Sequence, residues 1–228
     1  MSLWQQIQRF FDAQPDVLYA CTNLSYSEFH TEYRTALVFA VPFATRVQIK
    51  GYCEAEFHAA LIAVRLRAET LSAQLMALLA RQGVKACAPP VAQRDEMGLC
   101  APFSFKYAAM RAGLGWMGKN DVIITERYDP HQRLCALLID APLPCGEPMT
   151  APRCPEGCDA CVRACPHHAL TGALWTPTSQ RRDLIDHQLC NRMRSAYIAG
   201  HGRKHECGLC LAACPIGSAW QNHQSESK

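Results

Sequence analysis

The sequence predicts an α+β protein in two parts, an α/β domain at residues 1–147 and a cysteine-rich domain at residues 148–220. Three observations support this division. First, a strand pattern and then a long amphipathic helix pattern occur early in the chain. Second, prolines and glycines are concentrated within residues 142–157. Third, eight of the 14 cysteines lie within residues 154–214. A chain of 228 residues with 49% hydrophobic content can build one substantial core and a small appended domain. Residues 221–228 are polar and we expect them to fray.

The first part begins with a strand and a long helix. Thr35–Val41 is apolar and β-branched and Pro42 follows it, which is typical of a buried strand. Glu54–Gln82 is predicted to be one helix, roughly 43 Å long at 1.5 Å per residue, with Gly83 as its C-cap. Its apolar residues recur in steps of three and four, which predicts a helix that packs on a sheet or, as the alternative, forms a dimeric coiled-coil seam. This apolar stripe consists of Phe57, Leu61, Val64, Ala68, Leu71, Leu75 and Leu78.

A shorter helix and two strands complete the α/β domain. The helix is predicted at Phe103–Ala112 and ends at Gly113. Asp121–Thr125 and Leu134–Ile139 have strand patterns, and the turn residues Tyr128-Asp129-Pro130 lie between them. These two strands are therefore expected to form a hairpin. Five prolines then lie within residues 142–155, which places the domain boundary near Pro148.

Composition excludes several classes of protein. The net charge of +3 does not by itself indicate binding to nucleic acid or to acidic membranes. Met1–Phe11 lacks the pattern of a signal peptide, and the apolar runs at Ala36–Ala44 and Leu134–Leu143 are too short to span a bilayer. We therefore expect a cytoplasmic protein whose cysteines serve metal or redox chemistry rather than disulfides. The six cysteines outside the cysteine-rich domain are mostly expected to be small buried side chains.

The remaining eight cysteines form two motifs and one isolated residue. Each motif ends in Cys-Pro, with three residues between that cysteine and the one before it. This is the pattern of bacterial ferredoxins, in which the last cysteine of each motif ligates the other cluster. Two 4Fe–4S clusters need eight thiolates, and Cys190 completes the number. The crossover rule assigns one cluster to Cys154, Cys158, Cys161 and Cys214, and the other to Cys165, Cys190, Cys207 and Cys210.

Some details leave alternatives. The gap between Cys154 and Cys158 holds three residues instead of two, so Cys154 is the least secure ligand and Cys145 its nearest substitute. Paired cysteine motifs also build structural zinc sites, which is the competing interpretation. No cysteine pair is followed by the histidine that haem attachment needs. His167 and His168 are interpreted as solvated loop residues.

A glycine-rich segment precedes the cysteine motifs. Gly113, Gly115 and Gly118 match G-x-G-x-x-G, but a helix comes before the motif and a strand after it, the reverse of a dinucleotide-binding fold. The glycines still allow a ligand to approach the backbone closely. Trp116 and Lys119 are then candidates to contact a planar cofactor or its anionic edge; the alternative is a tight helix-to-strand turn with Trp116 in the core. The candidate cofactor-binding residues are Gly113, Gly115, Trp116, Gly118, Lys119 and Asn120.

The segment Arg111–Asn120, the two cysteine motifs and Cys190 together resemble the epoxyqueuosine reductase family, over roughly residues 102–217. The resemblance implies a nitroreductase-like α/β domain followed by a bacterial-ferredoxin-like domain with two 4Fe–4S clusters. It also implies a cobalamin beside the clusters, which feed electrons to its cobalt. Reductive dehalogenases are similar in this arrangement.

Two departures from the family pattern limit what the resemblance implies. The chain ends soon after the second motif, so we expect a short form without the family's C-terminal helical-repeat domain that binds tRNA. The family's proposed proton donor, an aspartate, aligns with Leu99, and Asp95 and Glu96 are the nearest acids. Cys100–Lys106 replaces the family's pattern there, so no catalytic residue is assigned.

Three functions remain at this point. The favoured one is an iron–sulfur oxidoreductase whose clusters pass electrons to a second cofactor, cobalamin, which reduces a small molecule. The second is an electron carrier or reactivase for a corrinoid or other redox partner, and the third is a flavin enzyme. The expected partners are an external electron donor such as ferredoxin or flavodoxin and a small-molecule substrate or redox partner protein. A homodimer is considered, and neither specific tRNA binding nor a membrane is expected.

Overall fold

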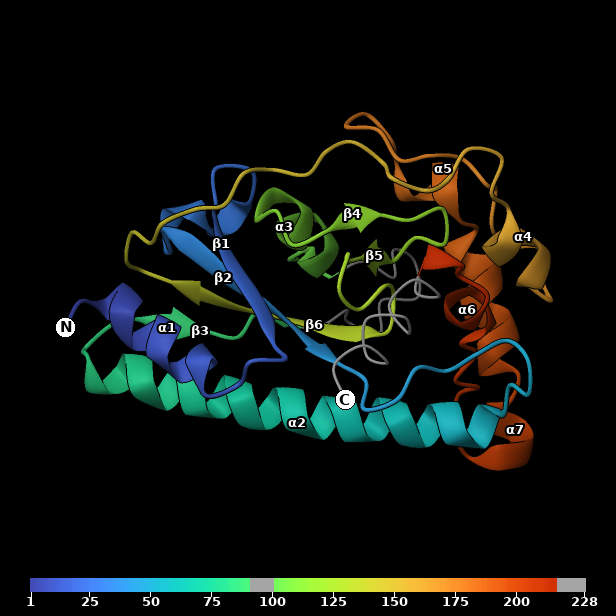
Figure 1. The fold of residues 1–228 in the computed structure, drawn as a ribbon, viewed down its shortest axis with the longest axis horizontal. Helices are drawn as coiled ribbons and strands as arrows, with labels where there is room; N and C mark the ends of the chain where they lie inside the picture. Colours follow the sequence, from blue (N-terminus) through green and yellow to red (C-terminus); the bar gives the residue numbers. More distant parts are fainter. Residues whose placement is uncertain (91–100, 217–228) are drawn as a thin grey trace, which may run out of the picture. The chain divides into compact units, whose positions relative to one another are not determined.

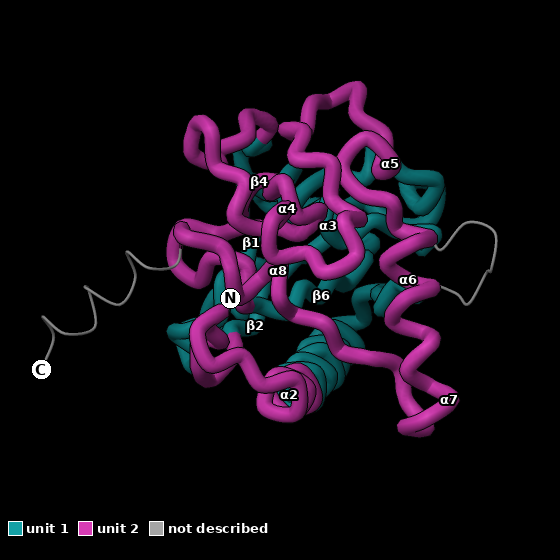
Figure 2. The backbone as a smooth tube through the Cα atoms, turned by 90° about the vertical axis from the view of Figure 1, so that its right-hand side faces the viewer, with its two compact units in different colours: residues 1–42, 63–114, 132–149 teal, residues 43–62, 115–131, 150–228 magenta. Residues whose placement is uncertain are grey.

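The computed structural model describes residues 1–90 and 101–216 and divides the chain into two compact units (Figure 2). Unit 1 contains Met1–Pro42, Ala63–Leu114 and Gln132–Met149. Unit 2 contains Phe43–Ile62, Gly115–His131 and the chain from Thr150 onward. The units are therefore interleaved in sequence. The expected domain limits at residues 147 and 220 stay a prediction.

A four-stranded antiparallel sheet forms the centre of unit 1. Its order is β1 (Leu18–Asn23), β2 (Thr35–Pro42), β6 (Gln132–Ile139) and β3 (Ala86–Cys87). Every residue of β2 is buried, because this central strand pairs along its whole length with β6 and also with β1. The strand predicted at Thr35–Val41 is confirmed.

Helices cover both faces of this sheet. Figure 1 shows the strands lying between α2 (Glu54–Arg81) and α3 (Phe105–Arg111), with α1 (Leu3–Asp12) near the N-terminus. A short 3-10 helix, η1 (Glu28–Thr31), precedes β2. The prediction of one long helix ending before Gly83 is confirmed, and Gly83 has the positive φ of +66° expected of a C-cap.

The apolar stripe of α2 is buried within the chain, as a helix packed on a sheet requires. The prediction was wrong at two positions, because Leu61 and Leu78 are only half-buried, and Leu79 is buried in place of Leu78. The buried residues of the stripe are Phe57, Val64, Ala68, Leu71, Leu75 and Leu79.

The hairpin expected between residues 121–125 and 134–139 is wrong. Residues 134–139 belong to β6, while the short strand β5 (Ile123–Ile124) pairs instead with β4 (Trp116–Met117). The turn after β5 is closed by Thr125 and Asp129, which exchange backbone hydrogen bonds of 2.9 and 3.0 Å, so it does not lead into a hairpin with β6. An eight-residue apolar strand gains more by pairing with the equally long, buried β2 than with a two-residue neighbour.

Unit 2 consists mainly of short helices joined by loops. They are α4 (Ala160–Ala164), α5 (Arg181–Leu184), α6 (His187–Ser195), α7 (Ile198–His201) and α8 (Leu209–Ala212). A small core of Cys161, Ala169, Leu170 and Ile185 holds several of them together. Of the helices within residues 1–90 and 101–216, none combines the length and apolarity needed to cross a membrane.

The expectation that the scattered cysteines are mostly buried is wrong for the described ones. Cys21 is buried in β1, but Cys87 and Cys135 are only half-buried, and Cys53 and Cys145 are exposed. The exposed pair lies outside the sheet, just before α2 and in the proline-rich stretch, where no apolar layer covers the chain. Cys100 lies outside the described residues.

Candidate metal centre

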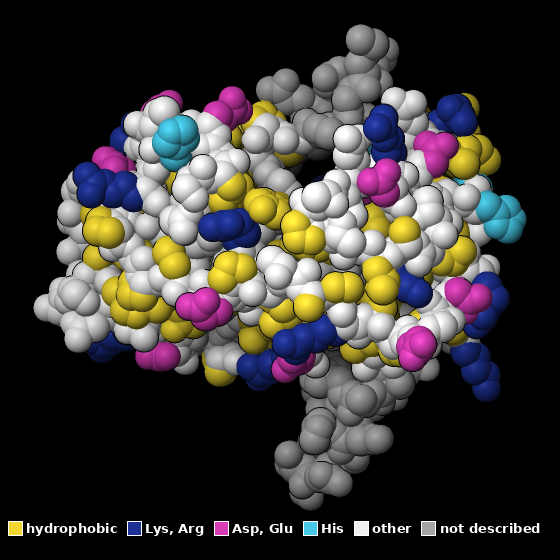
Figure 3. Space-filling view, turned by 90° about the horizontal axis from the view of Figure 1, so that it is seen from above, with side chains coloured by type: hydrophobic (Ala, Val, Ile, Leu, Met, Phe, Trp, Pro, Cys, Tyr) yellow, Lys and Arg dark blue, Asp and Glu magenta, His cyan; other side chains and the backbone are white. Residues whose placement is uncertain are grey.

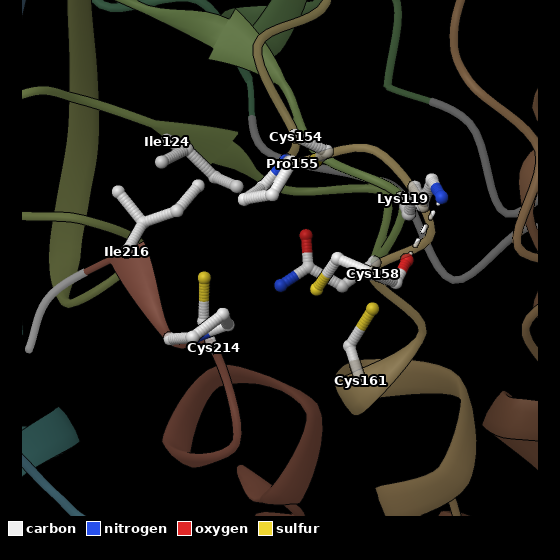
Figure 4. Close-up of a pocket in the computed structure, with 10 residues that line it drawn as sticks. Lys119, Ile124, Cys154, Pro155, Cys158, Cys161, Cys214 and Ile216 are labelled. Atoms are coloured by element: carbon white, nitrogen blue, oxygen red, sulfur yellow. Dashed lines mark hydrogen bonds between the residues drawn. The ribbon is translucent and has the colours of Figure 1, made fainter.

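Four cysteines of unit 2 surround one cavity. Cys158, Cys161 and Cys214 point toward it in Figure 4. Cys158 precedes α4, Cys161 lies within α4, and Cys214 follows α8. The space between the lining residues is about 290 Å³ and is open to solvent. Its lining comprises Lys119, Asn120, Ile124, Cys154, Pro155, Cys158, Cys161, Cys214, Pro215 and Ile216.

The wider gap in the first motif is absorbed by a turn. The backbone N–H of Cys158 donates to the carbonyl of Pro155 over 3.1 Å, and Gly157 has a φ of +68°. A positive φ suits glycine, which has no Cβ to clash with the backbone. Cys154 therefore still borders the cavity together with the other three cysteines of the set that the crossover rule predicts.

The second predicted set also gathers in unit 2. Cys165, Cys190 and Cys210 pack against the small apolar core around Ile185. Cys207 is close enough to Cys190 and Cys210 to affect the pKa of both thiols. The fold thus brings Cys190, which belongs to neither compact motif, to the cysteines with which the sequence groups it.

Two thiols of each set, Cys161 and Cys214 of the first and Cys190 and Cys210 of the second, have raised pKa values. Burial, and after it the neighbouring cysteines, raise the pKa of Cys210 to about 12. Burial first, and then the charges of Asp129 and of neighbouring cysteines, raise the pKa of Cys214 to about 12. The pKa values of Cys161 and Cys190 are raised in the same direction, first by burial. A bound metal must displace these protons, because the thiolate is the ligand.

The start of α2 anchors the second motif. Glu54 accepts two hydrogen bonds from the guanidinium of Arg203, at 2.7 and 2.8 Å, and one from the backbone N–H of Glu206. These interactions, led by the Arg203 hydrogen bonds, lower the pKa of Glu54 to about 2. The hydroxyl of Tyr52 accepts from the N–H of Gly208 over 2.8 Å. The loop that carries Cys207 is therefore fixed on both sides.

The end of the glycine segment contacts both cysteine motifs. Lys119 donates from Nζ to the carbonyl of Cys158 over 2.8 Å, and Asn120 donates from Nδ2 to the carbonyl of Cys210 over 3.2 Å. Lys119 and Asn120, which were predicted to bind a cofactor, also line the cavity. The sequence could not predict their contacts with Cys158 and Cys210, because these partners lie 39 and 90 residues further along the chain.

The rest of the glycine segment has a structural explanation. A Cβ on Gly115 would lie 2.3 Å from the carbonyl oxygen of Ile124, and one on Gly113 would lie 2.5 Å from that of Glu147. Trp116 is 3% exposed within β4, in agreement with the interpretation of a tight turn with this side chain in the core. Cofactor binding by Gly113, Gly115, Trp116, Gly118, Lys119 and Asn120 stays a prediction.

A buried charged network in unit 2 was missed by sequence reasoning. Asp129 was interpreted only as a turn residue, yet it is 2% exposed and contacts both Arg46 and His131. Nothing in the local pattern distinguishes it from a solvated turn aspartate.

The described part of the chain holds no site for a single metal ion, and the expected position of the proton donor lies outside it. Among residues 1–90 and 101–216, no three or more His, Cys, Asp or Glu side chains are close enough to hold one metal ion. A tetrahedral zinc site needs each thiolate about 2.3 Å from the ion. Asp95, Glu96 and Leu99, around the expected position of the proton donor, lie outside the described residues.

No model of a known protein family matches the chain. One curated protein, the epoxyqueuosine reductase of Synechococcus sp. (strain RCC307), is 33% identical over 127 residues, which is 56% of this chain and 37% of that protein. This chain is related in sequence to the epoxyqueuosine reductases. The resemblance seen in the motifs is thereby confirmed, although the chain spans less than half the length of the epoxyqueuosine reductases that it matches.

Solved structures share the fold. The epoxyqueuosine reductase of Streptococcus thermophilus superimposes with a TM-score of 0.56 at 14% identity, over 96% of this chain and 67% of that one. A reductive dehalogenase, described as performing B12-dependent dehalogenation, gives a TM-score of 0.55 at 17% identity, over 80% of this chain and 25% of that one. At these identities the likeness to the epoxyqueuosine reductase and the dehalogenase establishes a common mixed α/β fold with an antiparallel sheet.

Proposed function

We propose that this protein is an iron–sulfur oxidoreductase that holds two 4Fe–4S clusters and passes electrons from them to a second cofactor. The observation that carries the proposal is the grouping of the seven motif cysteines and Cys190 into two sets. Four surround one cavity, and the other four gather around α6 and α8. Thiols at these positions fit the donor set of two cubane clusters, which cysteine thiolates hold.

The clusters would supply one-electron transfer, and the chain's own residues would set their surroundings. Lys119 and Asn120 hold the carbonyls of Cys158 and Cys210 and so fix one loop of each motif. Cys161 and Cys214 are buried, which limits the access of water to two of the four cysteines of the first set. Hydrogen bonding and solvent exposure are the features by which proteins tune such clusters.

Cobalamin is the second cofactor that we propose, and flavin is the alternative. The proposal rests on the relation to epoxyqueuosine reductases and on the fold shared with a reductive dehalogenase described as B12-dependent. When bound, the corrinoid would supply the reducing cobalt centre. The cavity beside Lys119 and Asn120 is lined by cysteines and is assigned to a cluster, so the described geometry assigns no residue to the corrin.

Anaerobic purification followed by iron, sulfide and zinc analysis tests the clusters. We expect about eight iron and eight sulfide per chain, from eight thiolates in two 4Fe–4S clusters. Stoichiometric zinc without sulfide would overturn the proposal.

The ultraviolet–visible spectrum of the same sample separates the functions. A corrinoid or flavin band in addition to cluster absorption supports an oxidoreductase with a second cofactor. If clusters are present and neither cobalamin nor flavin binds at tens of micromolar, the carrier or reactivase function replaces the enzyme.

A further inference from the structure

Arg46, Asp129 and His131 form a buried network in unit 2. Their side chains are 9%, 2% and 4% exposed. Oδ1 of Asp129 accepts from the backbone N–H of His131 over 2.7 Å and lies 2.7 Å from its Nδ1. Oδ2 of Asp129 lies 2.9 Å from Nε of Arg46. The two groups form an ion pair, but the angle at the Nε–H group does not meet the requirement for a hydrogen bond.

The network reaches a predicted cluster ligand. Nη2 of Arg46 donates to the backbone carbonyl of Cys214 over 2.9 Å. Cys214 is the crossover cysteine of its set: it comes from the second motif but borders the cavity with the three cysteines of the first. A single guanidinium therefore joins a buried carboxylate to the backbone of a ligand that links the two motifs.

The backbone holds Asp129 in an uncommon conformation. Its φ is +51°, in the left-handed region that few non-glycine residues adopt. Paired backbone hydrogen bonds with Thr125 fix it there. Phe43 packs edge-on against the His131 ring, with centroids 5.8 Å apart, and its N–H donates to the His131 carbonyl. Strain of this kind persists only where the surroundings enforce it, and it is frequent at functional sites.

Stability alone is a weak reason for such a network. Burying a charged pair costs desolvation energy that the attraction between the charges often fails to recover. An apolar set of side chains would fill the same space without that cost. The direct bond to Cys214 suggests instead that the charges act on what this cysteine holds.

We propose that Arg46, Asp129 and His131 are positioning residues that fix Cys214 and set the charge balance beside the cluster held by Cys154, Cys158, Cys161 and Cys214. The inference rests on the proposed function, since it presupposes that cluster. Reduction adds one electron, taken from an external donor, so a nearby cation favours the reduced cluster and a nearby carboxylate disfavours it. Arg46 and Asp129 therefore oppose one another, and His131 holds the carboxylate in place.

The test is a redox titration followed by electron paramagnetic resonance, on the full chain with its clusters, with dithionite as reductant. Asp129→Asn should shift one of the two midpoint potentials upward by at least a tenfold change in the reduction equilibrium, about 59 mV for one electron. Arg46→Gln should shift the same potential downward, and Arg46→Lys should restore most of it. Opposite signs from the two variants identify a charge effect, because mere loosening of the fold would not reverse direction.

Glu32→Gln is the matched control. It removes one carboxylate from an exposed ion pair with Lys85 in unit 1, where the side chains are 62% and 54% exposed, and neither potential should move. If Asp129→Asn does not fold, Arg46→Gln and Arg46→Lys decide the question alone.

The outcomes separate the two proposals. Wild-type protein without iron and sulfide overturns the proposed function itself. Wild-type protein with both clusters, and variants whose potentials stay unchanged while their melting temperature falls, overturn only this inference. Equal shifts of both clusters, or shifts of the same sign in the Asp129→Asn and Arg46→Gln variants, overturn it as well.

Discussion

At the scale of single residues, the position of Cys190 depends on its neighbours rather than on its local motif. It lies in α6, its thiol is half-buried, and its pKa is raised first by burial and also by Cys207 and Cys165. Sequence spacing could only count it as the missing eighth thiolate. The fold places it against the same apolar core as Cys165 and Cys210.

Cys190→Ala should therefore lose about half of the iron and sulfide, because one of two 4Fe–4S clusters loses a ligand. Cys53→Ala is the control, since this exposed cysteine lies in the same unit but in neither set. Metal analysis of both anaerobic proteins measures the effect. Full iron content in the Cys190 variant would show that another residue supplies the eighth ligand.

Gly208 is a second residue whose identity is dictated by packing. A Cβ at this position would lie 2.3 Å from Cζ of Phe57, a ring that is 3% exposed. Gly208→Ala should destabilise the protein by about 1–3 kcal/mol, the usual cost of overpacking a core. Thermal unfolding should show a clear drop in Tm.

Gly200→Ala provides the comparison for Gly208→Ala. Gly200 lies in α7 and a Cβ there meets no atom within 4 Å, so alanine should be neutral or stabilise by up to about 1 kcal/mol. Equal effects of the two substitutions would contradict the packing argument.

At the scale of elements, the first turn of α2 is tied to the second cysteine motif through Glu54. Its carboxylate is stabilised by Arg203 and lies at a helix N-terminus, where negative charge is favourable. The periodicity of α2 predicted the helix and its buried stripe. It could not predict that the carboxylate at its start would meet a residue 149 positions away.

Glu54→Gln should lower stability at neutral pH and loosen the loop of Cys207. The folded pKa of Glu54, about 2, is below the unfolded value of about 4.3. The stabilisation is therefore fully present above pH ~4.3 and is lost as the pH falls through the folded pKa of about 2. Urea unfolding of the metal-free protein at pH 7, 4 and 2.5 should show the difference between wild type and variant shrinking with acidity.

Glu56→Gln, in the same first turn, is the control for Glu54→Gln. Its side chain is exposed, and its substitution should leave the pH profile unchanged. A difference between wild type and Glu54→Gln that stays constant from pH 7 to 2.5 would rule out the charge explanation.

At the scale of the whole molecule, charges of both signs are mixed. Basic and acidic side chains are both scattered over the face seen in Figure 3, and the net charge is +3. Tight binding to nucleic acid depends on many phosphate contacts from Lys and Arg. We therefore expect only weak, salt-sensitive binding of tRNA.

A filter-binding titration of tRNA at low and at physiological salt checks this expectation. Affinity should fall steeply as salt rises, since released counterions supply most of the binding free energy. Sub-micromolar binding that survives physiological salt would contradict it, and would indicate a surface built for tRNA.

Residue spacing by itself determined the buried strand at residues 35–41 and the long helix with its C-cap, because local periodicity follows the chain. The same spacing predicted the two cysteine sets. Only the tertiary structure decided that β6 pairs with β2 rather than with its neighbour along the chain. It also decided that Glu54 meets Arg203, and that Arg46 joins Asp129 to Cys214. Arg46 lies 83 residues from Asp129 and 168 residues from Cys214 in the sequence. Contacts between such distant residues depend on the packing of the whole chain and not on any local pattern.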